Sequence, residues 1–195
     1  MSTLPEQFAR IIEQSSDEDI NILTDYLRNF EKKQQGEFST YLSASLNMTR
    51  TLDDQSSVVS IPNTPFIHNN MAIPHGGILA VLIDTAMGTL ANSTCPEGFS
   101  AVTTNLAIHY LSVADEASIS AHARIIRNGR HTMVIEGNIL QEDGKHIATA
   151  TGSFFIVPKN SLLLLRGSNR LFFKKNLSVV LAKHADSSLV VLIAE

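Results

Sequence analysis

Apolar and polar residues recur with different periods in successive parts of the chain. In the range Leu4–Gln35 the apolar residues fall on every third or fourth position, which is typical of helices. Ser16, followed by three acidic residues, predicts the start of a second helix, and Lys32 and Lys33 before Gly36 predict its end. We expect two helices packed on the flank of a main domain; a docking or regulatory arm is the alternative.

A period of two replaces this pattern after Phe38. Tyr41–Met48 alternates polar with apolar residues and predicts a half-buried strand, and Ser57–Ile61 predicts a second one. The following loop, Pro62–Pro74, is rich in asparagine and proline. A meander of four strands, separated by turn residues such as Asn128-Gly129 and Glu142-Asp143-Gly144, is then predicted over Ala101–Leu111, Ala117–Ile126, Thr132–Leu140 and His146–Val157.

The range His75–Gly88 lies between these two groups of strands and reads as a helix. Its run Ile78–Ile83 is apolar without interruption, so the helix should be buried on every side. Asp84 follows this run, although a buried carboxylate is costly unless it is paired or neutralised. Asp84 shares a helix face with Gly77, near the amino end, where unpaired N–H groups and the helix dipole favour negative charge. An oxyanion-type site with a carboxylate on the same face is therefore predicted.

Together these elements predict an α+β fold in which an antiparallel sheet wraps around one long buried helix. We expect three parts: a helical amino-terminal extension over residues 1–37, the main domain over 38–158, and a carboxyl-terminal extension over 159–195. The last part contains apolar runs such as Leu162–Leu165 but no chemical motif. It could add strands or a helix, or form an interface, and no function is assigned to it.

Composition narrows the classes of partner. The formal charge of −4 offers no basic field for nucleic acid, and no apolar run reaches the length of a membrane span. Cys95 is the only cysteine, which excludes an intrachain disulfide, and Met1–Gln14 lacks the pattern of a secretion signal. We expect a cytoplasmic protein that binds neither nucleic acid nor membrane. Without a His-Glu-x-x-His motif or paired cysteines, no metal and no other cofactor is expected.

The spacing of several residues resembles the hotdog-fold acyl-CoA thioesterases of the PaaI-like group. The resemblance covers about residues 38–158. Two positions depart from it, since the family often carries glycine at Ala72 and proline at Val113. The residues that carry the resemblance are Asn69, His75-Gly76-Gly77, Asp84, Val102-Thr103-Thr104, Ile108-His109-Tyr110-Leu111-Ser112 and Asn128-Gly129-Arg130.

The resemblance implies a hotdog dimer, often paired into a tetramer, that hydrolyses acyl-CoA at the dimer interface. Asp84 would be the general base or the nucleophile, and the Gly76 N–H would polarise the thioester carbonyl. Asn69 would face the carbonyl or the attacking water from the subunit opposite Asp84. Thr103 would help to orient the water, and His75 would be structural or hold the site together.

Elementary chemistry agrees with this assignment. Hydrolysis develops negative charge on the thioester oxygen, which backbone donors at a helix start stabilise in a dry site, and desolvation makes a carboxylate a better base. His75 and Asp84 are nine residues apart, which places them on opposite helix faces and argues against a direct dyad. Gly77 allows the substrate to approach the backbone closely.

A small basic turn is formed by Arg127, Asn128, Gly129 and Arg130. It is either a solvated hairpin or a clamp for the phosphates of coenzyme A, for which arginine geometry is suited.

Two other functions remain open. The chain could be a hotdog protein that binds acyl-CoA without turnover, as a ligand sensor, but Asp84, Asn69 and Thr103 together favour the enzyme, because a binder needs no base. An acyl hydratase or dehydratase on the same fold ranks last. The acyl group of the substrate is not determined by the sequence.

Overall fold

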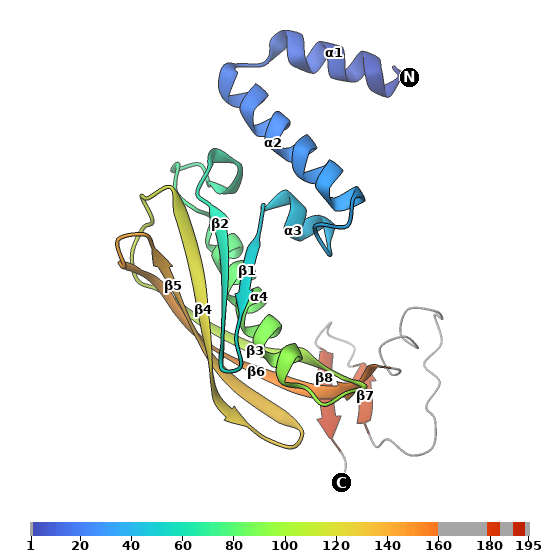
Figure 1. Cartoon of the computed structure of the whole chain (residues 1–195), viewed down its shortest axis with the longest axis vertical. Coiled ribbons are helices and arrows are strands. Elements are labelled where there is room, and N and C mark those ends of the chain that lie inside the picture. The colour runs from blue at the N-terminus through green and yellow to red at the C-terminus, as the bar shows by residue number, and fades with distance from the viewer. Residues whose placement is uncertain (1, 160–178, 184–188, 194–195) are drawn as a thin grey trace. The chain divides into compact units, whose positions relative to one another are not determined.

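The computed structural model describes residues 2–159, 179–183 and 189–193. It divides the chain into two compact units, Met1–Pro158 and Lys159–Glu195. In the first unit a six-stranded antiparallel sheet packs against one long helix, α4 (Gly76–Thr94) (Figure 1). The second unit contains an antiparallel hairpin of β7 (Val179–Lys183) and β8 (Leu189–Ile193). The predicted α+β architecture of the main domain is confirmed.

Two helices open the first unit, α1 (Leu4–Gln14) and α2 (Asp17–Gln34), as the apolar spacing predicts. The Asp19 N–H donates to the Ser16 hydroxyl over 3.2 Å, which starts α2, and Gly36 follows its end at φ +87°. No residue of α1 is buried. Two aromatic pairs join helix α2 to the rest of the unit: the ring centroids of Tyr26 and Phe66 lie 6.2 Å apart, and those of Phe30 and Tyr41 lie 5.6 Å apart.

The strand predicted over Tyr41–Met48 is wrong, because this range begins with a short helix, α3 (Tyr41–Ser45). Its start is fixed by Thr40, whose hydroxyl accepts the Ser43 N–H over 3.0 Å. Asn47, at φ +46°, then reverses the chain before β1 (Thr49–Leu52). Ser43 of the alternating pattern is part of the cap at the start of this helix, and the Ser45 hydroxyl donates to the Tyr41 carbonyl within it. A run of five residues is too short to distinguish the helical period from the strand period.

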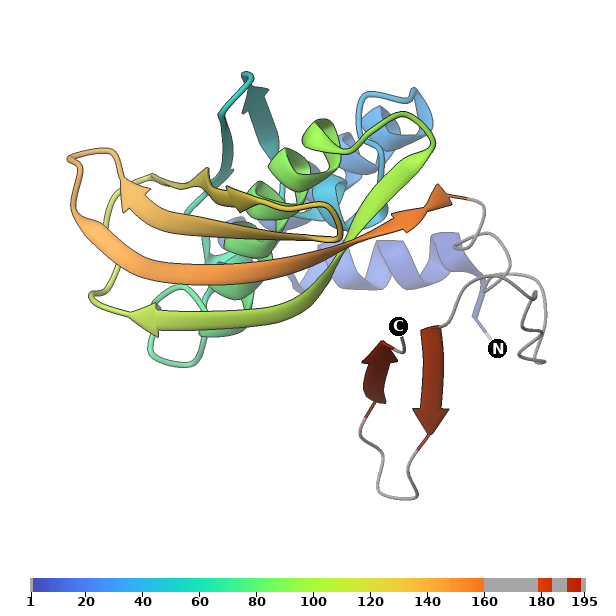
Figure 2. The same cartoon turned by 90° about the horizontal axis from the view of Figure 1, so that it is seen from below.

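The other strands are β2 (Ser56–Pro62), β3 (Phe99–Tyr110), β4 (Ser118–Asn128), β5 (Thr132–Gln141) and β6 (His146–Pro158). Their order in the sheet is β1-β2-β4-β5-β6-β3, so the predicted meander of four strands is wrong for β3, which pairs with β6 at the far edge. Helix α4, about 28 Å long at 1.5 Å per residue, carries the chain across the sheet between β2 and β3. Figure 2 shows the sheet curving beside this helix.

The side of helix α4 that faces the sheet forms part of the core. Leu82, Ile83, Met87 and Leu90 are fully buried there. Gly137 of β5 allows the close approach, since a Cβ at this position would lie 2.7 Å from Ile83 Cγ1. The opposite side of α4 carries residues that the single chain covers only in part, among them Gly77, Val81, Asp84 and Gly88.

Strand β3 forms one edge of the sheet over twelve residues, and its outer backbone groups have no strand beside them in the described part of the chain. Its pairing with β6 shifts register between Thr103 and Asn105, which leaves Thr104 outside the ladder. The Thr104 hydroxyl donates to the Ser153 carbonyl over 3.0 Å. Such bulges turn neighbouring side chains to new directions and occur often beside active sites.

Candidate active site

The loop before α4 folds back on itself and delivers two of the predicted residues. The Asn69 N–H donates to the Ile73 carbonyl over 2.9 Å, and the His75 N–H donates to the Ile67 carbonyl over 2.9 Å. His68 is held by a hydrogen bond of 2.8 Å between its Nε2 and Asn63 Oδ1. These bonds fix where the loop ends, and therefore where α4 begins.

Asn69 is half-buried and forms part of this turn. Its Oδ1 accepts the Met71 N–H over 2.8 Å, which is the turn-forming use of asparagine. Its Nδ2 group has no acceptor within residues 2–159, so the amide keeps two N–H donors for a group outside the chain. The structure thus gives Asn69 a turn role and leaves its predicted substrate contact as a proposal.

Ala72 adopts a left-handed backbone conformation in the same loop, at φ +56°, where the resembled family often carries glycine. A Cβ costs about 1–2 kcal/mol in this conformation, and the larger unfolded-state entropy of glycine offsets part of that cost. We therefore expect Ala72→Gly to raise Tm by about 2 °C in a thermal scan. Ala117→Gly is the control, because its φ is not positive and glycine should lower Tm there; an unchanged or lower Tm for Ala72→Gly would show that the loop relaxes the strain.

The first turn of α4 presents one unused backbone donor. His75 caps the helix, with its Nδ1 accepting the Gly77 N–H over 2.9 Å and its carbonyl accepting the Ile78 N–H over 2.9 Å. The Gly76 N–H has no acceptor in the described part of the chain. An unpaired N–H at a helix start is suited to bind an oxyanion. His75 makes no hydrogen bond to Asp84, in agreement with their opposite helix faces.

Asp84 and Thr103 are brought together by the fold. The Thr103 hydroxyl donates to Asp84 Oδ1 over 3.0 Å, across nineteen positions of sequence. Asp84 is half-buried rather than fully buried, because its side of α4 is only partly covered by the chain. Its second carboxylate oxygen has no donor in the described residues and can accept a proton or a water molecule.

The Gly76 N–H and the Asp84 carboxylate of one chain are far apart. They are separated by eight residues of the same helix, or about 12 Å along its axis at 1.5 Å per residue. A single thioester carbonyl needs both groups within about 3–3.5 Å of its reacting atoms. One chain therefore holds the two halves of a hydrolytic site but does not combine them.

The predicted basic turn is the connection between β4 and β5. The Gly129 N–H donates to the Thr132 carbonyl over 2.9 Å, and a Cβ at Gly129 would lie 2.8 Å from that oxygen. Arg127, Asn128 and Arg130 are exposed, and neither arginine has an ion pair within the described ranges. The structure does not bring this turn into contact with Asp84, so its role in binding remains a proposal.

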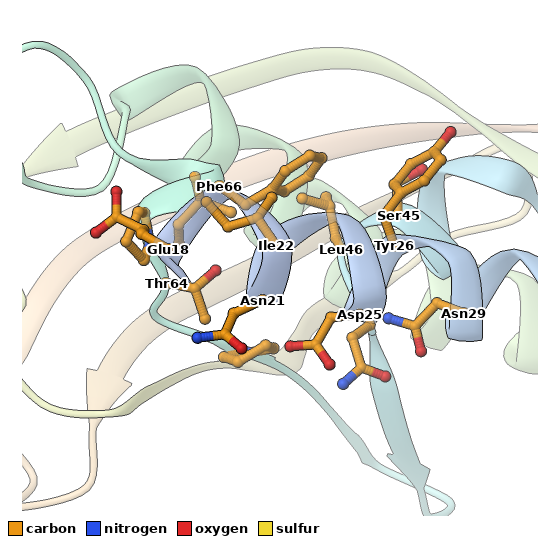
Figure 3. Close-up of a pocket in the computed structure, with 14 residues that line it drawn as sticks. Glu18, Asn21, Ile22, Asp25, Tyr26, Asn29, Ser45, Leu46, Thr64 and Phe66 are labelled. Atoms are coloured by element: carbon orange, nitrogen blue, oxygen red, sulfur yellow. The ribbon is translucent and has the colours of Figure 1, made fainter. Parts of the chain in front are cut away.

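A groove of about 410 Å³ lies between α2 and the segment before His68, and it contains none of the predicted site residues (Figure 3). Its lining includes the carboxylates of Glu18 and Asp25 and no lysine or arginine, which makes it unsuited to the phosphates of coenzyme A. Within the described part of the chain no cluster of His, Cys, Asp and Glu could hold a metal ion. None of the helices in that part has the length and apolar character needed to span a membrane.

Sequence reasoning assigned no role to Tyr110, although its hydroxyl donates to the Gly76 carbonyl over 2.9 Å. The contact joins the last residue of β3 to the first of α4, thirty-four positions apart. The sequence feature that could have indicated this contact is the pair of adjacent glycines at the helix start, because such a flexible backbone requires support from a residue elsewhere in the fold.

Comparison with known proteins agrees with this geometry. The family model described as the thioesterase superfamily matches residues 71–148. A protein of Saccharolobus solfataricus named as an esterase is 30% identical over 106 residues, which are 54% of this chain and 75% of that protein. The chain belongs to the thioesterase superfamily. The resemblance inferred from Asn69, His75-Gly76-Gly77 and Asp84 is therefore confirmed at the level of the family.

Solved structures place this thioesterase-superfamily chain among hotdog proteins. The BH2602 protein of Bacillus halodurans, whose crystal structure contains CoA, is 31% identical with a TM-score of 0.74, covering 79% of this chain and all of that one. The PaaI protein of E. coli, from the phenylacetic acid degradation operon, is 22% identical with a TM-score of 0.57, covering 68% of this chain and 96% of its own. The second likeness concerns the fold alone.

Proposed function

We propose that this thioesterase-superfamily protein hydrolyses an acyl-CoA thioester to the free acid and coenzyme A. The observation that carries the proposal is the Asp84–Thr103 pair, a carboxylate with a hydroxyl donor on an incompletely covered face of the central helix. The CoA in the crystal structure of the 31% identical Bacillus halodurans protein supports a CoA ester as substrate. A protein that only binds acyl-CoA has no use for this pair.

In the proposed reaction Asp84 accepts a proton from a water molecule that Thr103 helps to orient. The water oxygen attacks the thioester carbon, and the charge that develops on the carbonyl oxygen is stabilised by the Gly76 N–H and by the Asn69 amide. The C–S bond then breaks, the carboxylic acid is released, and the thiolate of coenzyme A takes up a proton. Direct attack by Asp84, with hydrolysis of the resulting anhydride, is the alternative for the first step.

The site requires two subunits in this proposal. Because Gly76 and Asp84 lie about 12 Å apart in one chain, the donor and the base that act on one carbonyl come from different copies. Asn69 belongs to the same loop and helix start as Gly76, so it would join the Asp84–Thr103 pair of the partner. The uncovered edge of β3, which carries Thr103, is the surface suited to pair with a second copy. Assembly into a tetramer and the cytoplasmic location stay predictions.

The experiment that tests the function is a panel of aromatic, short-chain and medium-chain acyl-CoA esters, with the released thiol followed by a thiol reagent. We expect turnover of at least one ester. The chain contributes one cysteine of its own, Cys95, so the signal of protein alone is subtracted. Binding of acyl-CoA without release of thiol across the panel would contradict the proposal and favour the sensor.

Arg130 offers a test of the proposed phosphate clamp. Arg130→Ala should raise KM for acyl-CoA about two- to tenfold and leave kcat nearly unchanged, because contacts remote from the reacting carbon bind substrate and transition state equally. The effect should shrink with added salt, which screens an exposed charge pair. Arg10→Ala, on α1, is the matched control for the loss of one exposed arginine. An unchanged KM at low ionic strength would make this turn a solvated hairpin.

A further inference from the structure

The peptide group between Gly76 and Gly77 is held at both ends. Its N–H donates to His75 Nδ1 over 2.9 Å, and its carbonyl accepts the Tyr110 hydroxyl over 2.9 Å. Because Nδ1 is the acceptor, the hydrogen-bond network assigns the imidazole proton to Nε2. Two adjacent glycines give a backbone its greatest conformational freedom, and these two side chains remove it at the first turn of α4.

The Tyr110 ring also limits what can stand at position 76. A Cβ at Gly76 would lie 3.3 Å from Tyr110 Cζ and 3.4 Å from its hydroxyl oxygen, which is tighter than an ordinary contact. The ring therefore lies against the glycine itself, whose own N–H has no acceptor in the described part of the chain. A side chain at position 76 would displace either the ring or the helix start.

Stability alone does not account for this arrangement. Within one chain Tyr110 is 53% exposed, so its ring buries little apolar surface of its own copy, and an exposed hydroxyl bond adds little to the folding of that copy. The hydrogen bond instead fixes the plane of one peptide group next to the unused donor. We propose that Tyr110 is a positioning residue, which together with His75 orients the Gly76 N–H toward the developing oxyanion; this inference rests on the proposed thioester hydrolysis.

The His75 and Tyr110 side chains thus form a clamp on the Gly76–Gly77 peptide group, and the position of Tyr110 gives this clamp a second property. It is the last residue of β3, the edge strand on which Thr103 also lies. The strand therefore contacts both halves of the site, the carboxylate through Thr103 and the helix start through Tyr110. A shift of β3 along the sheet would displace both groups together.

Tyr110→Phe is the test variant, because it keeps the ring against Gly76 and removes only the hydroxyl. We expect kcat to fall roughly three- to tenfold, which corresponds to about 0.7–1.4 kcal/mol in the barrier, with KM within a factor of about two. Tyr41→Phe is the matched control, since Tyr41 is likewise exposed and donates no side-chain hydrogen bond in the described residues; its kcat should be unchanged. A kcat equal to wild type in Tyr110→Phe would overturn the proposal, and so would a change confined to KM, which would indicate direct substrate contact.

A second measurement separates this inference from the proposed function. Labelling only the glycines with ¹⁵N gives ten backbone signals, one for each glycine. In Tyr110→Phe we expect exchange broadening of the Gly76 and Gly77 signals, while Gly98, next to the opposite end of β3, stays unchanged. This result supports the clamp even if no ester in the panel is hydrolysed. Unaltered Gly76 and Gly77 signals would exclude it, whatever the activity.

The two ends of the clamp should also depend on each other. Once His75→Ala has released the Gly77 N–H, the added change Tyr110→Phe should lower kcat by less than it does alone. Additive losses in the double variant would mean that the two side chains act independently and would contradict a shared positioning role.

Discussion

Asp84→Asn should abolish most of the activity while the protein remains folded. The amide keeps the shape of the side chain and can still accept the Thr103 hydroxyl, but it cannot accept a proton from water. Loss of a general base costs about 10²- to 10⁴-fold in kcat. Because a half-buried charge is removed, we expect Tm to hold or rise, and KM to change little. Steady-state kinetics and a thermal scan measure these quantities.

A matched substitution identifies what is specific to Asp84. Asp54→Asn removes the same charge from an exposed turn between β1 and β2 and should leave kcat unchanged. If Asp84→Asn retained more than about a third of wild-type turnover, Asp84 would have no part in the chemistry. If the variant unfolded, Asp84 would be a structural acid, and the acyl-CoA sensor would become the better account of the protein.

Mixing two inactive variants should restore activity if the site is shared between subunits. Asn69→Asp keeps the oxygen that accepts the Met71 N–H but removes the amide donors, so the turn survives while the proposed contact is lost. In hybrid dimers with Asp84→Asn, one of the two sites regains both native groups. Random pairing of equal amounts makes half of the dimers hybrid, so about a quarter of all sites should recover.

The recovery must be measured in dimers whose exchange has been verified, for example with two affinity tags. Asn70→Asp introduces the same charge one residue away, at an exposed side chain, and should by itself stay active. Verified hybrids that remain as inactive as their parents would refute the shared site. Inactive hybrids would also contradict the inference that Gly76 of one copy and Asp84 of the other act on the same carbonyl, which rests on their separation of about 12 Å along one helix.

Some features of this fold are encoded locally and others are not. The range Ile78–Ile83 and the residues around Ser16 predict their helices because periodicity and capping act within a few turns. The position of β3 beyond β6 is not readable in this way, since the strands after α4 share one alternating pattern and any could pair with any other. The strand predicted over Tyr41–Met48 is wrong for a related reason, because over the five residues of α3 a helix and a strand can show the same pattern of apolar and polar residues.

The candidate site shows the same division. Asp84 stands out in the sequence because a carboxylate directly follows the apolar run Ile78–Ile83, and the glycines before that run mark the helix start. Thr103, which contacts Asp84, stands beside a bulge in β3, and Tyr110, which contacts Gly76, is the last residue of that strand. Both follow from the path of the chain through the sheet, which no local pattern records.

Helix α1 has a consequence for how the unfolding of this protein can be measured. It is eleven residues long with no buried side chain, and the Thr3 N–H donating to Glu6 over 2.8 Å is among the few bonds that support its start. Isolated helices shorter than about 12–15 residues are marginal in water. Its helix–coil equilibrium is therefore uncoupled from the cooperative loss of the core. Far-ultraviolet circular dichroism records the loss of α1 together with the loss of the core. Its unfolding transition will therefore not coincide with the transition recorded by probes buried around Met87 and Phe154, and a single two-state fit does not describe the whole chain.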